Sequence, residues 1–195
     1  MPKISEEARQ GRRNQILDAA RLCFQKEGLH ETTMQDIIRA SDLSAGAVYS
    51  YFKSKDDLIF AAVATSLDDL RTMLDETMRR APAKSADDLI GLLLPAITKF
   101  AARDGYDLRR IALLGWSEAQ RSERLRVAIQ SHYAAFRADL AKLAASWRPS
   151  SNAADADAMA KLLLTVLLGA VVQSAIMGDA TAEDIARGLR LLTQA

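Results

Sequence analysis

Tyrosine and lysine side chains stand close together in the run Tyr49-Ser50-Tyr51-Phe52-Lys53-Ser54-Lys55. Tyrosine hydroxyls donate hydrogen bonds and lysine ammonium groups carry positive charge, so the run suits the binding of phosphate groups. The small residues Ser44-Ala45-Gly46 precede it and would let backbone N–H groups approach a phosphate or a base edge. The combination predicts contact with nucleic acid.

Two short helices and a tight turn would position these residues. Thr32 or Thr33 can cap the first helix, and Thr32 with Gln35 fits a capping box. Ser41-Asp42 then interrupts the apolar pattern, and Asp tolerates the left-handed backbone that a tight turn often needs. Ser44 is the predicted cap of the second helix. This arrangement is a helix-turn-helix, whose second helix can lie in the DNA major groove.

Four groups of residues in this segment form a more specific pattern: Thr32-Thr33, Asp36-Ile37, Leu43-Ser44-x-Gly46, and Tyr49-x-Tyr51-Phe52-Lys53-x-Lys55-x-x-Leu58. With them, the segment resembles the DNA-binding domain of the tetracycline-repressor (TetR) family of bacterial transcription regulators. The chain departs from the usual pattern at Asp42, where the family commonly has Gly, and at Ile38, where it often has Ala.

The resemblance implies a sequence-specific regulator, most often a repressor. Phosphate contacts are expected from the backbone at Ser44 and from the side chains of Thr33, Tyr49, Lys53 and Lys55. Base-edge contacts are expected from small residues and a hydroxyl, with one further tyrosine as a candidate: Ala45, Gly46, Ala47, Ser50 and Tyr51. Because this face has few long polar side chains, DNA shape or bridging water should supply part of the specificity.

Composition favours an all-α fold of about nine helices. The 195 residues are 49% hydrophobic and 26% charged, with few aromatic or β-branched runs. The formal net charge is only +1, so DNA binding must come from local charge placement. Residues 1–55 are predicted to form the DNA-binding domain, and residues 56–195 a helical bundle for ligand binding and dimerisation. No apolar leader begins the chain, so a cytoplasmic location is expected.

Capping and apolar periodicity predict the remaining helices. Residues up to Gln10 are expected to fray, and the first helix should end at Gly28. A long helix is predicted from Lys55 to about Arg80. The later helices are expected from Ser85, and over about 107–120, 123–147, 155–177 and 181–194. Pro95 should kink its helix, either without a role or so as to leave room for a ligand.

The helix over 155–177 is apolar nearly all round and therefore needs cover on every side. One chain of this size can cover only part of it, so a second copy of the chain is the predicted cover. Family resemblance agrees, since TetR-like proteins dimerise through their last two helices. The predicted interface residues are Leu164, Leu168, Gly169, Val172, Ile185 and Leu189.

The resemblance also implies a small apolar or amphipathic effector that releases the DNA. Candidate pocket residues are Met73, Phe100, Trp116, His132, Tyr133, Phe136 and Gln173. His132 lies on an apolar helix face, where a histidine is more often a core residue with one hydrogen bond than a ligand contact. Cys23 could pack in the core or sense redox state, and the core is the stronger reading.

Other classes of function find little support in the sequence. No second His, Cys or carboxylate stands at metal-ligand spacing from His132, so neither a metal nor a cofactor is predicted. No paired nucleophile and base and no phosphate-binding glycine loop indicates an enzyme. An activator, or a helical adaptor protein without a small-molecule effector, remains the alternative.

Overall fold

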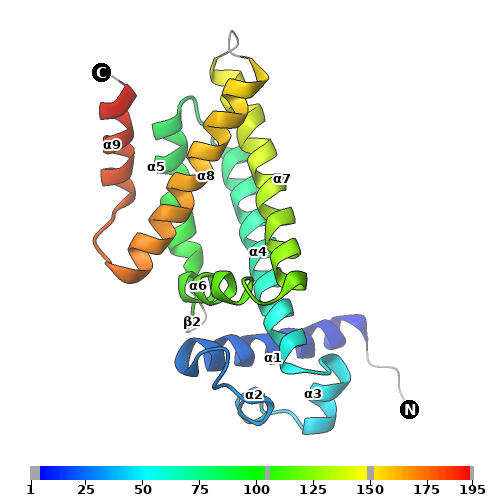
Figure 1. Cartoon of the computed structure of the whole chain (residues 1–195). Coiled ribbons are helices and arrows are strands. Elements are labelled where there is room, and N and C mark those ends of the chain that lie inside the picture. The colour runs from blue at the N-terminus through cyan, green and yellow to red at the C-terminus, as the bar shows by residue number, and fades with distance from the viewer. Residues whose placement is uncertain (1–4, 104–105, 149–151, 194–195) are drawn as a thin grey trace. The chain divides into compact units, whose positions relative to one another are not determined.

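The computed structural model describes residues 5–103, 106–148 and 152–193, which form nine helices and one pair of two-residue strands (Figure 1). The predicted all-α class is confirmed. The strands β1 (Ala102–Arg103) and β2 (Tyr106–Asp107) were not predicted, because a pairing this short leaves no periodic pattern in the sequence. The predicted helix end at Gln194 lies outside the described residues.

The chain divides into two compact units. The first combines Met1–Ser66 with Arg103–Arg126, and the second combines Leu67–Ala102 with Val127–Ala195. The helices α4 (Lys55–Arg80) and α7 (Glu123–Trp147) each contribute residues to both units. The predicted domain boundary near Lys55 falls at the start of α4, and it stays a prediction.

The first unit contains the predicted DNA-binding segment. Its elements are the first part of α4, the first residues of α7, and the helices α1 (Glu6–Glu27), α2 (Met34–Ser41), α3 (Ala45–Tyr51) and α6 (Leu108–Glu118). Apolar residues at helical spacing fill its core: Ile16, Leu17, Ala20, Phe24, Ile37, Val48, Phe52 and Leu58. α1 packs along both α2 and α6, so this helix supports the helix-turn-helix.

The ends of α1 have local causes. Ser5 caps the helix by accepting a hydrogen bond from the backbone of Ala8, and Glu6 and Glu7 complement the positive N-terminal dipole. The expectation of fraying up to Gln10 is therefore wrong from Glu6 onward. The helix ends as predicted at Gly28, whose φ of 85° suits a residue without Cβ.

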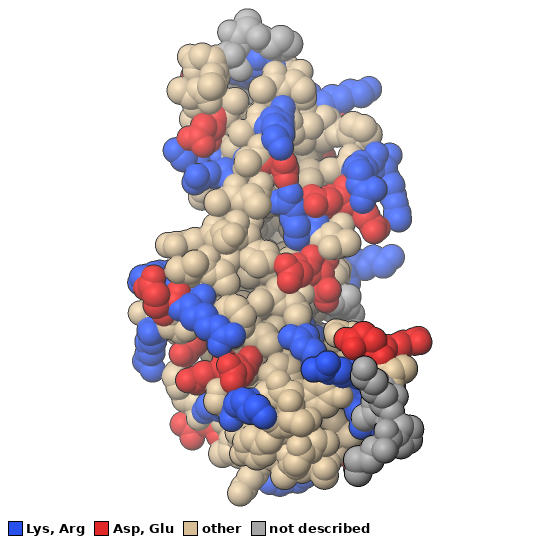
Figure 2. Space-filling model, turned by 90° about the vertical axis from the view of Figure 1, so that its right-hand side faces the viewer, with Lys and Arg blue, Asp and Glu red and all other residues tan. Residues whose placement is uncertain are grey.

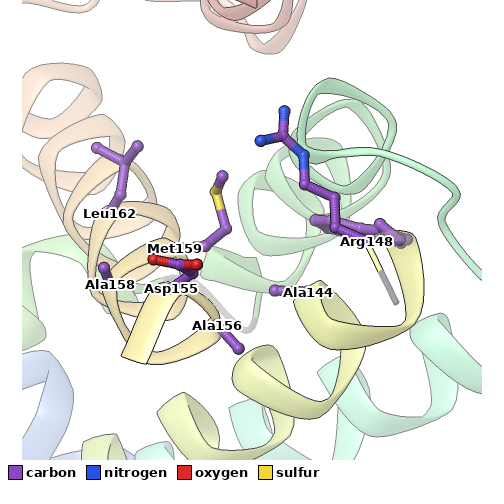
Figure 3. Close-up of a pocket in the computed structure, with 8 residues that line it drawn as sticks. Ala144, Arg148, Asp155, Ala156, Ala158, Met159 and Leu162 are labelled. Atoms are coloured by element: carbon purple, nitrogen blue, oxygen red, sulfur yellow. The ribbon is translucent and has the colours of Figure 1, made fainter. Parts of the chain in front are cut away.

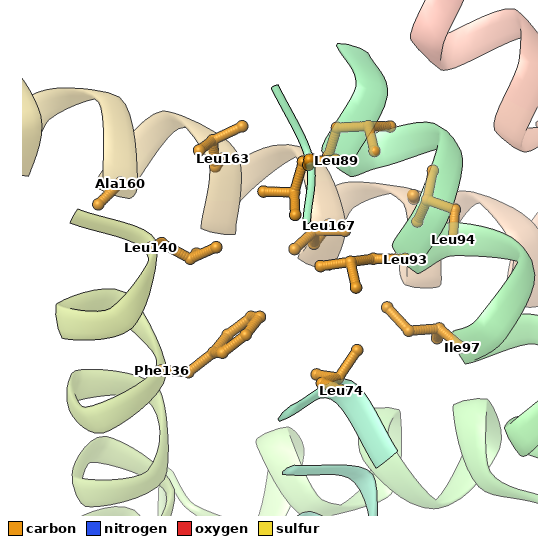
Figure 4. Close-up of a cluster of buried hydrophobic side chains, with 13 residues drawn as sticks. Leu74, Leu89, Leu93, Leu94, Ile97, Phe136, Leu140, Ala160, Leu163 and Leu167 are labelled. Carbon is orange, nitrogen blue, oxygen red and sulfur yellow. The ribbon is translucent and has the colours of Figure 1, made fainter. Parts of the chain in front are cut away.

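The second unit is a helical bundle. Its elements are the later parts of α4 and α7 together with α5 (Ala86–Ala101), α8 (Ala153–Ile176) and α9 (Ala182–Thr193). Its apolar core is drawn from α4, α5, α7 and α8 and includes Leu74, Leu89, Leu93, Ile97, Phe136, Leu140, Leu163 and Leu167 (Figure 4). α9 packs along α5, and α5 runs continuously past Pro95.

Side-chain caps begin these helices, mostly where the sequence predicts them. Ser85 accepts a hydrogen bond from the backbone of Asp88, and Thr181 from that of Asp184. α8 starts two residues earlier than expected, because Asn152 caps it in a reciprocal pair with Asp155.

Candidate nucleic-acid interface

The start of α2 is fixed by a capping box on Thr33. Its hydroxyl accepts a hydrogen bond from the Asp36 backbone at 3.2 Å, while the Asp36 carboxylate accepts one from the Thr33 backbone at 2.9 Å. The predicted box between Thr32 and Gln35 is wrong. Thr32 is fully buried, and its hydroxyl donates to the Gly28 carbonyl at 2.7 Å, so it closes the turn after α1.

The Asp36 carboxylate is held ionised by the same box. Hydrogen bonds from the Thr33 hydroxyl and backbone lower the pKa of Asp36 below its ordinary value, and Arg39 on the next turn adds to the effect. The Thr33 hydroxyl also donates to this carboxylate at 2.6 Å. The side chain predicted to contact phosphate is therefore also a structural cap.

The turn between α2 and α3 takes the conformation that the sequence predicts. Asp42 has a φ of 53° and a ψ of 31°, which is the left-handed region. The side-chain amide of Gln15 on α1 donates to the Ser41 carbonyl at 2.7 Å. α1 thus anchors the turn, and Ser44 caps α3 by accepting a hydrogen bond from the Ala47 backbone at 3.2 Å.

α3 presents its N-terminal end to solvent. Ser44, Ala45, Gly46 and Ser50 are exposed, Tyr49 keeps 43% of its surface, and Ala47 and Tyr51 are half-buried. A Cβ built on Gly46 would meet no atom within 4 Å, so this backbone is open to an approaching surface. The Ser50 hydroxyl donates to the Ala47 carbonyl at 2.6 Å, which leaves its oxygen as an acceptor.

The two predicted phosphate-binding lysines differ in their surroundings. Lys53 is exposed, whereas Lys55 is half-buried and its ammonium donates to the His30 carbonyl at 2.8 Å. An ammonium group has three donors, so the internal bond leaves two for phosphate. Lys55 therefore also fastens the start of α4 to the turn after α1.

Further cations lie in this unit besides the two lysines. The Arg13 guanidinium lies 5.4 Å from the centre of the Phe52 ring, and Arg39 is exposed on α2. On the face drawn in Figure 2, lysines and arginines are interspersed with aspartates and glutamates. Local placement rather than a broad basic patch would therefore have to attract phosphate.

A buried arginine joins α1 to α4 within the same unit. Arg21 is only 5% exposed, and it donates to Asp18 at 2.9 Å and to the Thr65 hydroxyl at 2.6 Å. Sequence reasoning missed it, because its position on α1 resembles any surface arginine until its partner 44 residues away is known.

The helix-turn-helix segment is similar to that of known bacterial regulators. Residues 16–62, from α1 into α4, match the family model described as bacterial regulatory proteins, tetR family. This segment belongs to the TetR family. A curated relative, the HTH-type transcriptional repressor Rv1474c of Mycobacterium tuberculosis, is 36% identical over 107 residues, covering 55% of this chain and 50% of that protein. The chain thus spans half or less of the first curated relatives that it matches.

Solved TetR-like structures match over almost the whole chain. Salmonella enterica GusR is 27% identical with a TM-score of 0.71, and the match covers 100% of both chains. A TetR transcriptional regulator from Chloroflexus aurantiacus is 24% identical with a TM-score of 0.72, covering 92% of each chain. The fold of the second unit is therefore also TetR-like.

The predicted effector residues are scattered. Trp116 belongs to the first unit and the other six to the second. Phe136 is 6% exposed within the apolar core, Met73 packs against that core, and Gln173 is exposed. That these residues line one pocket stays a prediction.

His132 already has partners for both ring nitrogens. Nδ1 lies 2.8 Å from the Ala128 carbonyl oxygen, and Nε2 lies 2.7 Å from an Asp68 carboxylate oxygen. Both partners accept hydrogen bonds, so the protonated ring can donate to both. His132 ties α7 to α4 and has no ring nitrogen left for an effector.

One cavity of about 350 Å³ lies between the end of α7 and the start of α8 (Figure 3). Its lining is mostly apolar and includes two charged residues, Arg148 and Asp155. None of the predicted effector residues lines it. Among the described residues, no group of three or more His, Cys, Asp or Glu side chains is placed to hold a metal ion.

The predicted dimer residues are half-buried in the single chain. Leu164, Ile185 and Leu189 pack against the core of their own unit, whereas Leu162 and Ile176 on α8 keep 51% and 70% of their surface. By length and composition α8 could cross a membrane, and only 22% of its most apolar window is buried. Its apolar surface therefore lacks cover in the single chain.

Proposed function

We propose that this protein is a cytoplasmic, homodimeric transcriptional repressor that binds a pseudopalindromic DNA operator and leaves it when a small molecule binds the second unit. The observation that carries the proposal is the exposed N-terminal end of α3, held by α1 through the turn at Asp42. Small residues there let the helix backbone enter the major groove closely. The names of TetR-family relatives, among them a repressor, agree with this role.

Exposed residues recur at helical spacing along α8 and support the homodimer. They form one stripe, the α8 stripe, made of the exposed residues Ala158, Leu162, Thr165, Gln173 and Ile176 together with the half-buried Gly169. Gly169 has open space around its Cβ position, so a second helix could approach there. A two-fold axis through this surface would pair each α8 stripe with its own copy and present two α3 helices to one operator. Burial in a dimer, rather than in a membrane, would account for the apolar character of α8.

The experiment is selection of bound duplexes from a random DNA pool at moderate salt, followed by binding measurements on the enriched sequence. Enrichment of an inverted repeat is the expected result. Affinity should fall steeply as salt rises, because phosphate contacts release counterions. Tight binding that stays flat across salt would overturn the proposal and favour a helical adaptor protein. A reporter gene placed behind the enriched sequence separates repression from activation.

A further inference from the structure

Arg71 on α4 has one guanidinium nitrogen without a partner. Its Nε donates to Asp75 at 2.9 Å and its Nη2 donates to Asp139. Nη1 is buried and has no hydrogen-bond acceptor among the residues that the structure describes. Buried donors are nearly always paired, so an orphaned one calls for an acceptor from elsewhere.

This nitrogen belongs to a side chain at the edge of the apolar core of the second unit. The guanidinium carbon of Arg71 lies 5.5 Å from the centre of the Phe136 ring, and Phe136 faces Leu74 and Leu140 inside that core (Figure 4). The two carboxylates bind two nitrogens of the guanidinium, and the guanidinium carbon lies over the Phe136 ring. An acceptor for Nη1 would therefore meet an aromatic and aliphatic surface as well.

Charge decides which kind of acceptor fits. Arg71 is already paired with Asp75 and Asp139, and Asp139 also accepts from Lys142 at 3.0 Å. Burial raises the pKa of Asp139, but the hydrogen bonds from Lys142 and Arg71 outweigh burial and lower it, so the carboxylate stays ionised near neutral pH. The two carboxylates already balance the charges of Arg71 and Lys142, so an anionic ligand would add an uncompensated negative charge, which is unfavourable. An uncharged oxygen acceptor would add no negative charge.

We propose that Arg71 Nη1 is the polar anchor of the effector site, and that the effector is an uncharged, mostly apolar molecule bearing an oxygen acceptor such as a carbonyl. This assignment rests on the proposed ligand-responsive function. It gives Arg71 the polar role that the sequence suggested for His132, whose nitrogens are both engaged.

The test uses three probes with one ring system: tetralin, its ketone tetralone, and tetralin carboxylate. Their affinities for the full-length protein are measured by calorimetry and by thermal shift, without DNA. Tetralone should bind about tenfold more tightly than tetralin, because a hydrogen bond from a charged donor adds that much. The carboxylate should bind no better than tetralin.

Two variants test whether Arg71 causes the preference for the ketone over the hydrocarbon. In Arg71→Met the ketone and the hydrocarbon should bind equally, whereas Arg80→Met, an exposed arginine on the same helix, should keep the preference. If Arg71→Met does not fold, Arg71→Lys replaces it, since it keeps the charge and removes the fork of donors.

The proposal is overturned if the wild type binds all three probes equally or none of them, if the carboxylate binds best, or if the preference survives in the Arg71 variants. Operator selection is measured separately. Its failure would overturn the regulator while leaving the probe preference intact, so the two outcomes are distinguishable.

Discussion

Both partners of His132 are acceptors, so the ring can donate to both of them only when each ring nitrogen carries a proton. Burial would lower its pKa, but the Asp68 carboxylate and the Ala128 carbonyl outweigh burial and raise the pKa above the ordinary value of 6.5. Arg71 opposes this shift by its charge. The strength of the hydrogen bond between His132 on α7 and Asp68 on α4 therefore depends on pH.

A group whose pKa is raised on folding adds stability that is fully present below its unfolded pKa and is lost as pH rises through its folded pKa. Because Asp68 is largely exposed, His132→Gln should cost only about 0.5 kcal/mol of unfolding free energy below pH 6.5, and progressively less as pH rises through the raised pKa of the folded protein. Urea unfolding at several pH values measures the difference. Gln130→Ala, exposed on the same helix, is the control, and a gap that does not change with pH would refute the linkage.

Lys53 and Lys55 should also behave differently when each is changed to alanine. Lys53→Ala should leave stability unchanged and weaken DNA binding with a salt slope smaller by about 1 for each copy, as expected for one lost phosphate contact. Lys55→Ala should weaken binding and also destabilise the fold by about 1 kcal/mol, because its bond to the His30 carbonyl is lost. Salt titrations and urea unfolding of both variants check this, and equal stability of the two would contradict the structural role of Lys55.

At the scale of helices, one substitution at the N-terminal end of α3 should change fold stability and DNA affinity in opposite directions. Gly46→Ala places a methyl group in open space on a helix, so it should stabilise the fold slightly, by about 0.5 kcal/mol. The same methyl group would keep the backbone away from DNA, and operator affinity should fall about tenfold. Thermal unfolding and operator binding are both measured for Gly46→Ala and compared with the wild type. Unchanged affinity would mean that α3 does not approach the groove through Gly46.

Helix limits were largely predictable because their causes are local. Ser44, Thr181 and Gly28 act on backbone groups within four residues, and the sequence displays those intervals directly. The missed start of α1 was also local, since Ser5 with Glu6 and Glu7 forms a recognisable cap. The identity of the α2 cap was missed because Thr32 and Thr33 are equivalent in pattern and differ only in burial.

Contacts between residues far apart in the chain could not be predicted from the sequence. Lys55 meets a carbonyl 25 residues away, and His132 meets a carboxylate 64 residues away. Helical periodicity marks both as ordinary residues, one charged and one on an apolar face. Phe136 illustrates the same limit for the effector site, because a core residue and a ligand contact have the same spacing along a helix.

At the scale of the whole molecule, burial of the α8 stripe would make the melting temperature of the proposed dimer depend on its assembly. Leu162→Glu would place a charge on this surface and should yield monomers in sedimentation velocity, with a melting temperature that no longer depends on protein concentration. Ala145→Glu, exposed on α7, should remain dimeric. A dimeric Leu162→Glu protein would place the interface elsewhere.

The exposed stripe on α8 also has a genetic consequence. A chain with an altered α3 and an intact α8 would still pair with normal chains in the same cell. Each mixed pair would hold one competent α3, where the proposed operator needs two. Such alleles should therefore be dominant over the wild type, whereas alleles that damage the α8 stripe should be recessive.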